Sequence, residues 1–337
     1  MLLARNNDKY IWATQAIKGE CYFCPACGEQ VILRQGKSNI SHFAHFSSND
    51  CLDNQEGETY EHLLGKQQIF EWALNNEWQP ELEVYLPEIN QRADLLLTIN
   101  DQKVALEFQC SPLTLQRLSE RNQGYASLNY KFWWILGSSY QRLINHYSAQ
   151  KFIQLHHNQL FLSFWEINNS RLKEIRYSQQ FLKITTKKVL NDVVTCRKRA
   201  KVDPDILKLL REIRRRKYDL FNCPLLCHQS FDQVKYFSYG IFCWQLKACL
   251  WLEDIPIFSN FELSEWYKKL WQVDSTEWGE FPCAGKAKIA YHFLHGFTRK
   301  LLQIGCIEIV NGKILLLSHP QWFKTPADKY RTLAICN

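Results

Sequence analysis

The sequence QRADLLLTINDQKVALEFQC, at residues 91–110, decides the fold. Two apolar runs flank the turn residues at 100–102, so this segment predicts two neighbouring strands. Each strand carries one acid in apolar surroundings, Asp94 in the first and Glu107 in the second. A buried carboxylate is costly unless it meets a cation or a hydrogen-bond network. The two acids therefore indicate a functional site.

The segments on either side of residues 91–110 predict a mixed α/β domain. A helix with apolar residues at helical spacing comes first, and a third strand joins the two above in a meander. A second helix follows, with Ser111 as its N-cap and Pro112 at its first position. In chain order we expect a helix at 58–75, strands at 81–86, 93–99 and 104–110, a helix at 111–128, a strand at 131–136, and flanking strands at 160–167 and 172–177.

The acid pair suits a hard divalent cation. Asp94 and Glu107 on adjacent strands offer the oxygen ligands that Mg²⁺ prefers, and such an ion activates water and neutralises a phosphodiester. The two-residue period of a strand places Gln109 on the same face as Glu107. The alternative is a structural ion pair of these acids with Arg92 or Arg121.

The two helices supply further polar groups. Glu58, His62 and Lys66 lie on one stripe of the first helix, with Glu61 beside His62; the alternative is a solvated ion-pair face. On the second helix, Arg121 and Tyr125 are four residues apart and could reach a phosphate and a base. The alternative there is an ion pair and a half-buried ring.

Residues 1–55 are rich in Cys and His but short of long periodic segments, which predicts a small module that needs a metal. CPACG at 24–28 is typical of a zinc knuckle, in which two thiolates three residues apart sit on a tight turn. Downstream, SHFAHF at 41–46 supplies two imidazoles and Cys51 supplies a thiol. We favour Cys24, Cys27, His45 and Cys51 as zinc ligands, with His42 competing for the fourth place. Cys21 is expected to be a packing residue.

Composition limits the class of protein. The chain has 337 residues, and its 14% aromatic side chains exclude global disorder. Its net charge of +7 favours an anionic partner. No run of 18 apolar residues and no signal-like N-terminus is visible, so a cytoplasmic location is expected. Thirteen Cys in such a compartment indicate metal ligands or core packing.

The rest of the chain predicts a mainly helical domain. We expect domains at 1–55, 56–185 and 186–337. A basic run at 197–217, with a helix start at Pro204, is a candidate for contact with a DNA backbone or a solvated linker helix. Further Cys and His residues at 223–249 have irregular spacing and are expected to be buried thiols.

Six motifs resemble the competence protein CoiA-like family, closely over residues 20–137. They are CPAC at 24–27, HFAH at 42–45, EHLLGK at 61–66, RAD at 92–94, EFQCS at 107–111 and RNQGY at 121–125. The resemblance implies a zinc-finger-like module, a three-layer PD-(D/E)XK-type (restriction-endonuclease-like) core and a poorly characterised C-terminal domain. It also implies a bacterial cytoplasmic protein that processes incoming DNA in transformation.

Carried over by motif, Asp94 and Glu107 are metal-binding acids, and Glu61 or Glu58 is the acid of the first helix. Ala93 replaces the usual Pro of the motif, which is harmless. Gln109 replaces the usual Lys, and an amide can hold the attacking water but carries no charge. Lys66 could supply that charge from the helix.

The sequence thus predicts a DNA nuclease that uses Mg²⁺ or Mn²⁺, with single-stranded DNA as its partner. The alternative is a non-catalytic DNA-binding mediator that recruits a strand-exchange recombinase. The expected catalytic residues are Glu61, Lys66, Asp94, Glu107 and Gln109, and the expected substrate contacts are His62, Arg92, Arg121 and Tyr125.

Overall fold

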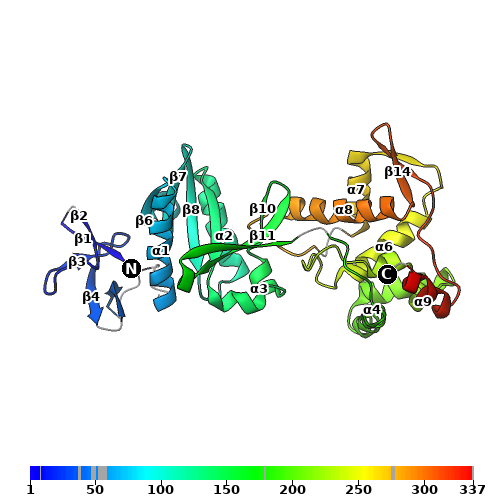
Figure 1. Cartoon of the computed structure of the whole chain (residues 1–337), viewed down its shortest axis with the longest axis horizontal. Helices are drawn as coiled ribbons and strands as arrows, with labels where there is room; N and C mark the ends of the chain where they lie inside the picture. The colour runs from blue at the N-terminus through cyan, green and yellow to red at the C-terminus, as the bar shows by residue number, and fades with distance from the viewer. Residues whose placement is uncertain are drawn as a thin grey trace. The chain divides into compact units, whose positions relative to one another are not determined.

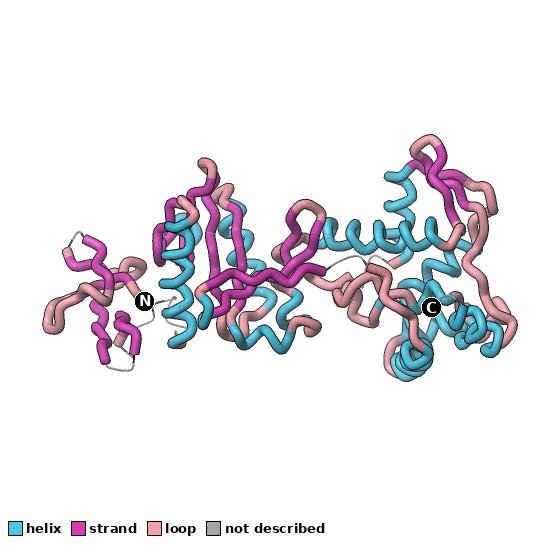
Figure 2. Tube along the Cα trace, viewed as in Figure 1, coloured by secondary structure: helices cyan, strands magenta, loops and turns pink. Residues whose placement is uncertain are grey.

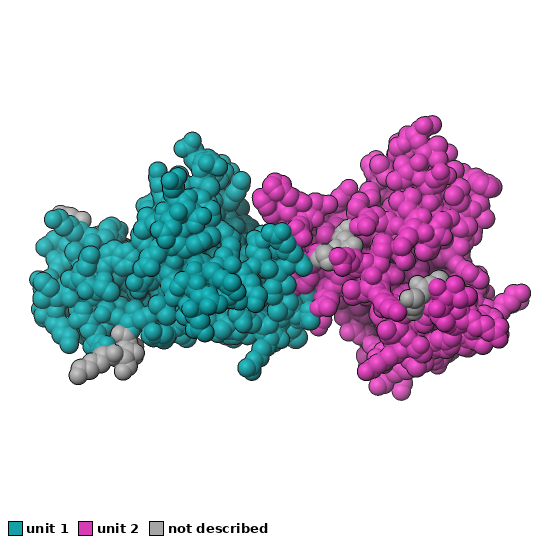
Figure 3. Space-filling model, viewed as in Figure 1, with its two compact units in different colours: residues 1–154, 161–176 teal, residues 155–160, 177–337 magenta. Residues whose placement is uncertain are grey.

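The computed structural model describes residues 1–7, 9–36, 39–46, 51, 59–177, 180–274 and 278–335. The chain divides into two compact units, one of residues 1–154 and 161–176 and one of residues 155–160 and 177–337 (Figure 3). Strands dominate the first unit and helices the second (Figure 2). Within the described ranges, no helix has both the length and the apolar character that a membrane crossing needs.

The central sheet of the first unit has the strand order β10-β11-β9-β8-β7-β6, with β12 beside β11. β6, β7 and β8 form the predicted antiparallel meander, and β9 joins β8 in parallel. A crossover helix, α2, links β8 to β9, as parallel neighbours require. The strands are β6 Gln79–Leu86, β7 Gln91–Ile99, β8 Gln102–Gln109, β9 Lys131–Leu136, β10 Gln154–His156, β11 Gln159–Glu166 and β12 Arg171–Tyr177.

Two helices cover opposite faces of this sheet. α1 (Tyr60–Asn75) packs on Leu106 and its neighbours, whereas Tyr125 of α2 (Leu115–Ser127) packs on Ala105, the adjacent residue of β8. Successive residues of a strand point to opposite faces, so the helices lie on either side (Figure 1). Both predicted helices are confirmed, but the start of the second one was wrong.

Thr114, not Ser111, is the N-cap of α2, and its hydroxyl accepts a bond from the Arg117 amide at 3.1 Å. Ser111 is used differently, because its carbonyl accepts bonds from the side chains of Gln109 (2.9 Å) and Tyr140 (2.7 Å). These bonds hold the segment before the helix in a non-helical path.

Gly65 allows α1 to lie very close to the sheet. A Cβ atom at this position would stand 2.1 Å from the Phe108 ring, far inside any real contact. The absence of a side chain at Gly65 therefore allows the close approach of α1 to β8, and this approach brings the next residue, Lys66, close to the strands of the sheet.

The N-terminal module is a five-stranded antiparallel sheet with the order β2-β1-β3-β4-β5. The sequence predicted a small module short of long periodic segments. Its strands have two to seven residues, and Tyr22, Val31 and Phe43 form a small core between them. The strands are β1 Leu3–Asn6, β2 Lys9–Trp12, β3 Tyr22–Phe23, β4 Gln30–Gly36 and β5 Asn39–His45.

The module docks on α1 and the central sheet of the same unit. Trp12 meets Phe70 of α1 edge to face, with ring centroids 5.3 Å apart. Leu2 is buried among residues of α1 and the central sheet. The N-terminal segment thus belongs to the core of its neighbour.

The second unit is built from helices with a small antiparallel sheet of order β13-β15-β14. Pro204 starts a helix as predicted, with Asp203 as its N-cap. The cysteines of 223–249 are buried, as expected. The elements are α4 Thr186–Arg199, α5 Pro204–Arg215, α6 Ile241–Glu253, α7 Leu263–Val273, α8 Lys286–Gln303, α9 Pro326–Ile335, β13 Asn260–Glu262, β14 Ile307–Val310 and β15 Lys313–Leu316.

Candidate active site and metal-binding group

The candidate active site lies where β7 and β8 stop pairing. The last register pair is Leu95 with Leu106, so Asp94 and Glu107 stand opposite each other just beyond the ladder. In place of a backbone bond, Oδ2 of Asp94 accepts the amide of Phe108 at 2.9 Å. The predicted acids are therefore neighbours across the strand pair, just beyond the last paired residues.

Asp94 is surrounded by groups from α1. His62 Nε2 lies 3.2 Å from Oδ2 of Asp94, and Lys66 Nζ lies 3.9 Å from Oδ1. Burial raises the pKa of Asp94, but His62, Lys66 and the Phe108 amide together hold that pKa well below its usual range. Asp94 is thus an ionised carboxylate inside the domain.

Glu107 points to the other face, toward α2. Its Oε1 accepts bonds from the Arg121 guanidinium and the Tyr125 hydroxyl. Arg121 also donates to the carbonyl oxygen of Arg92 at 2.9 Å. Burial outweighs these partners and raises the pKa of Glu107 to about 7. The structure therefore contains the ion pair with Arg121, and Tyr125 is fully buried, not half-buried.

Glu83 of β6 belongs to this site, although the sequence did not single it out. Its Oε1 lies 2.5 Å from Lys66 Nζ, and both side chains are buried. The amides of Leu2 and Leu3 donate to the same carboxylate at 2.8 to 3.0 Å. The only sequence signal was an acid within an apolar strand, the criterion that selected Asp94 and Glu107.

The backbone explains why Glu83 turns inward. Glu83 has φ +53°, a left-handed conformation that is uncommon for a side chain other than glycine. The register pairs Leu82 with Leu95 and Val84 with Ala93 but omits Glu83 and Asp94 between them. The alternation of side chains between the two faces is interrupted at this point, where neither Glu83 nor Asp94 belongs to a register pair.

Glu61 and Gln109 are held by other partners. The Glu61 carboxylate accepts the amide (2.6 Å) and the hydroxyl (2.8 Å) of Ser138, and it lines a pocket of about 500 Å³. The Gln109 amide donates to the Ser111 carbonyl at 2.9 Å. Glu58 lies outside the described residues.

The acids do not form a closed metal cage. Across the described ranges, the one group of three or more His, Cys, Asp or Glu side chains whose ligand atoms lie within 4.8 Å of one another is Cys24, Cys27, His45 and Cys51. An ion at Asp94 and Glu107 would need water or substrate oxygens to complete its shell.

The Cys/His group has the features of a metal knuckle. The Ala26 amide points at Cys24 Sγ at 3.4 Å, and Gly28 has φ +75°, which lets the chain turn back. Cys27 Sγ lies 3.4 Å from His45 Nε2. Thiolate and imidazole ligands in a four-membered group fit the tetrahedral preference of zinc.

Two other residues of the module lie outside the group. His42 places Nδ1 2.8 Å from the Ile40 carbonyl oxygen instead. Cys21 is exposed, so the expectation that it is a packing residue was wrong. Its position in a wide turn before β3 leaves it facing solvent.

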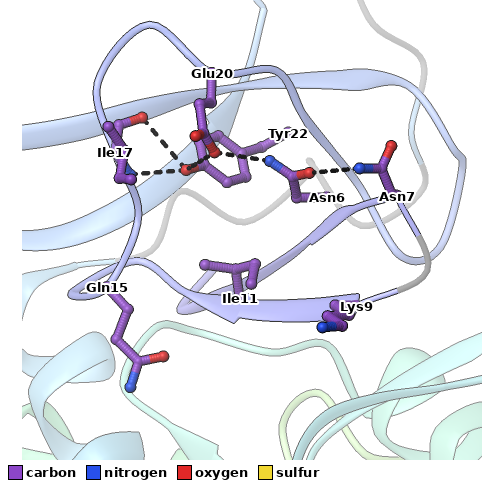
Figure 4. A pocket seen from close by; sticks show the side chains of 8 residues that line it. All are labelled: Asn6, Asn7, Lys9, Ile11, Gln15, Ile17, Glu20 and Tyr22. Carbon is purple, nitrogen blue, oxygen red and sulfur yellow. Dashed lines mark hydrogen bonds between the residues drawn. The ribbon is translucent and has the colours of Figure 1, made fainter.

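A separate pocket of about 430 Å³ lies on the module, lined by β1, β2 and the turn before β3 (Figure 4). The Tyr22 hydroxyl accepts the Ile17 amide at 2.7 Å and lies 3.2 Å from the Glu20 carboxylate. Asn6 donates to the same carboxylate at 2.9 Å. These polar groups bond one another and do not converge on the pocket.

Comparisons with known proteins point to one family. Residues 58–207 match the family model of the competence protein CoiA nuclease-like domain, and residues 6–53 match that of the CoiA N-terminal domain. The chain is 33% identical over 141 residues to competence protein CoiA of Bacillus subtilis (strain 168). That alignment covers 42% of this chain and 37% of the relative's length. No solved structure matches.

Proposed function

The chain belongs to the competence protein CoiA family, and on this premise we propose that it is a metal-dependent DNA nuclease that processes incoming DNA in natural transformation. The observation that carries the proposal is a pair of acids, the buried Glu107 and the partly buried Asp94, at the point where β7 and β8 stop pairing. The strand ladder does not need two acids there, and their burial is costly. A catalytic role explains their presence.

The donor set suits Mg²⁺ or Mn²⁺. Magnesium is commonly held by one or two carboxylates, with waters and substrate phosphate completing its shell. Asp94 would be one ligand, and Glu107 would be the second if its carboxylate turned from Arg121 and Tyr125 toward the face of Asp94. When bound, the ion would activate water and stabilise charge on the phosphodiester. Asp94 is kept ionised by His62, and Arg121 holds the Glu107 carboxylate in place.

The N-terminal group would hold a structural zinc. Cys24, Cys27, His45 and Cys51 provide four N and S ligands, the number that closed structural sites use. The apolar core of the module is small, so the metal would contribute directly to its folding.

We expect DNA, in single-stranded form, to be the substrate in the bacterial cytoplasm. Tyr60 at the start of α1 is 58% exposed and lines the pocket next to Glu61. An exposed aromatic ring can stack on an unpaired base, whereas a duplex keeps its bases inside. Competition between single- and double-stranded DNA for the purified protein measures this preference.

The nuclease proposal has a direct test. Asp94→Asn and Glu107→Gln remove charge with little change of volume, so cleavage with Mg²⁺ or Mn²⁺ should fall by about 100-fold or more while the fold persists. Glu81→Gln is the matched control, because Glu81 is an exposed acid of the same sheet that pairs with Lys103. Full cleavage by Glu107→Gln would contradict the proposal.

A second candidate function is a non-catalytic DNA-binding mediator that recruits a strand-exchange recombinase. It is favoured by one observation: the Gln109 amide donates to the Ser111 carbonyl, so the position that usually carries a lysine supplies no cation. If the wild type cuts no DNA with any divalent metal, while Glu107→Gln still supports transformation, the mediator function is the better account.

A further inference from the structure

Lys66 is a fully buried cation with two carboxylates near it. Its Nζ lies 2.5 Å from Oε1 of Glu83 but 3.9 Å from Oδ1 of Asp94, which is beyond hydrogen-bond distance. Both hydrogen bonds described for Asp94, from His62 and Phe108, fall on its other oxygen, Oδ2. The Lys66 ammonium is therefore drawn away from Oδ1 of Asp94 by Glu83.

Glu83 is itself held from a second direction. The amides of Leu2 and Leu3 bind both of its oxygens, and Leu2 is only 2% exposed within the core of α1 and the sheet. The left-handed backbone conformation at Glu83 costs energy, so the contacts of the Glu83 side chain must stabilise it by more than that cost. The docked N-terminal segment supplies two of those contacts.

We propose that Glu83 is a positioning residue: clamped by the Leu2 and Leu3 amides, it holds Lys66 off Asp94 and so keeps Oδ1 of Asp94 accessible to a divalent cation. Without the Glu83 charge, Asp94, 3.9 Å away, is the other described acid close to the Lys66 ammonium, and a buried cation gains from an acidic partner. Lys66 then competes with the metal for the same oxygen. The role of the metal in this inference rests on the proposed function.

The test uses the full-length protein and Mn²⁺ as the probe. Glu83→Gln should weaken Mn²⁺ binding, measured by titration calorimetry, at least tenfold. The double variant Glu83→Gln/Lys66→Met should restore binding to within about threefold of wild type, because the competing ammonium is gone. Glu81→Gln, on the same strand but exposed, should bind Mn²⁺ as the wild type does.

Glu83→Asp serves if the amide variant does not fold, since it keeps the charge and shortens the side chain; it should bind Mn²⁺ with intermediate affinity. Unchanged binding in Glu83→Gln or Glu83→Asp, or no recovery in the double variant, would overturn the proposal. A rank order of wild type, Glu83→Asp and Glu83→Gln, with recovery, supports it.

Two readouts do not depend on the metal. Hydrogen exchange at the Leu2 and Leu3 amides should accelerate in Glu83→Ala, which lacks the acceptor. A double-mutant cycle for thermal stability should find stronger coupling between Lys66 and Asp94 in the Glu83→Gln background than in wild type. If these hold but wild type binds no Mn²⁺, the nuclease proposal fails and the positioning contact stands; the reverse pattern refutes the positioning contact alone.

Discussion

Asp94 and Glu107 are neighbours across one strand pair, yet their surroundings move their pKa values in opposite directions. His62 and Lys66 keep the pKa of Asp94 low, whereas burial raises the pKa of Glu107 to about 7 despite Arg121. Residue type alone would assign both the same charge. The difference comes from which face each side chain takes, because Asp94 meets α1 and Glu107 meets α2.

This difference predicts a pH dependence of the metal-free protein. The pKa of Glu107 is raised from 4.5 to about 7 in the fold, so its contribution to stability is full below pH 4.5 and is lost as the pH rises through 7. The shift corresponds to about 3 kcal/mol. Urea unfolding of the wild type should therefore lose stability between pH 5 and 8, relative to Glu107→Gln. Parallel stability curves for the two proteins would contradict this.

At the residue scale the sequence predicted the acids Asp94 and Glu107 but not Glu83, which pairs with Lys66. The pattern of an acid within an apolar strand identified Asp94 and Glu107. Strand periodicity correctly predicted that Glu107 and Phe108 point to opposite faces of the sheet. Glu83 was not predicted as a site residue, because strand alternation in ELEVYL at 81–86 places it on the same face as Glu81, which is exposed. Its left-handed backbone reverses that assignment, and such a conformation arises from long-range contacts with Leu2 and Leu3.

At the scale of elements, the fit of α1 against β8 depends on Gly65. Ala has a better intrinsic helix propensity than Gly by about 1 kcal/mol, so Gly65→Ala would stabilise an isolated helix. Here the added methyl group meets the Phe108 ring, and overpacking of a core costs about 1 to 3 kcal/mol. We expect Gly65→Ala to lower the melting temperature. Glu71→Ala, on an exposed position of α1, is the control, and a raised melting temperature in Gly65→Ala would refute the packing argument.

The basic helices α4 and α5 should add non-specific affinity for DNA. Lys208, Arg211 and Arg214 are exposed on α5, and within the described part of the chain they make no ion pair. Arg216, in contrast, is tied to Glu212, Glu253 and Asp254, so its loss would disturb packing. Replacing Lys208, Arg211 and Arg214 by Gln should weaken DNA binding. It should also make the binding constant depend less steeply on the logarithm of the salt concentration, because fewer counterions are released.

The matched control replaces three exposed cations that already have acidic partners, Arg171, Lys173 and Arg176 of β12. These should release few counterions, so their loss should change the salt slope little. An identical slope in the α5 variant and the wild type would assign α5 to a role other than DNA binding.

Elements with strong local signals were predictable. The β6–β8 meander, β9 and the start of α5 at Pro204 follow from periodicity, turn residues and capping. Two gaps in the prediction have physical causes. The predicted start of α2 was wrong because tertiary bonds occupy Ser111 and the helix begins after Thr114. In the N-terminal module, β1, β2 and β3 have only two to four residues, too few for periodicity to show.

At the scale of the whole molecule, the N-terminal module and the candidate active site are parts of one folded unit. Leu3 begins β1 of the module and Leu2 directly precedes it, and the amides of both residues reach Glu83. We expect Cys27→Ser to release zinc, loosen the module and accelerate hydrogen exchange at Leu2 and Leu3, while the central sheet remains folded. Metal analysis and hydrogen exchange of the same sample measure both effects.

Zinc release without any change at Leu2 and Leu3 would show that the module is held on the sheet by its apolar contacts, such as Trp12 with Phe70, and not by the metal. A protein purified without chelator that contains no zinc would refute the structural zinc itself.

The bond between the Leu2 amide and Glu83 also has a kinetic consequence. Its two ends are 81 positions apart in the chain, so a refolding molecule must close a large loop before they meet. Contacts within the β6–β8 meander are far more local and form without that delay. After dilution from denaturant, the sheet should regain its circular-dichroism signal first. Mn²⁺ binding should return in a later phase, after Leu2 has reached Glu83 and closed the loop.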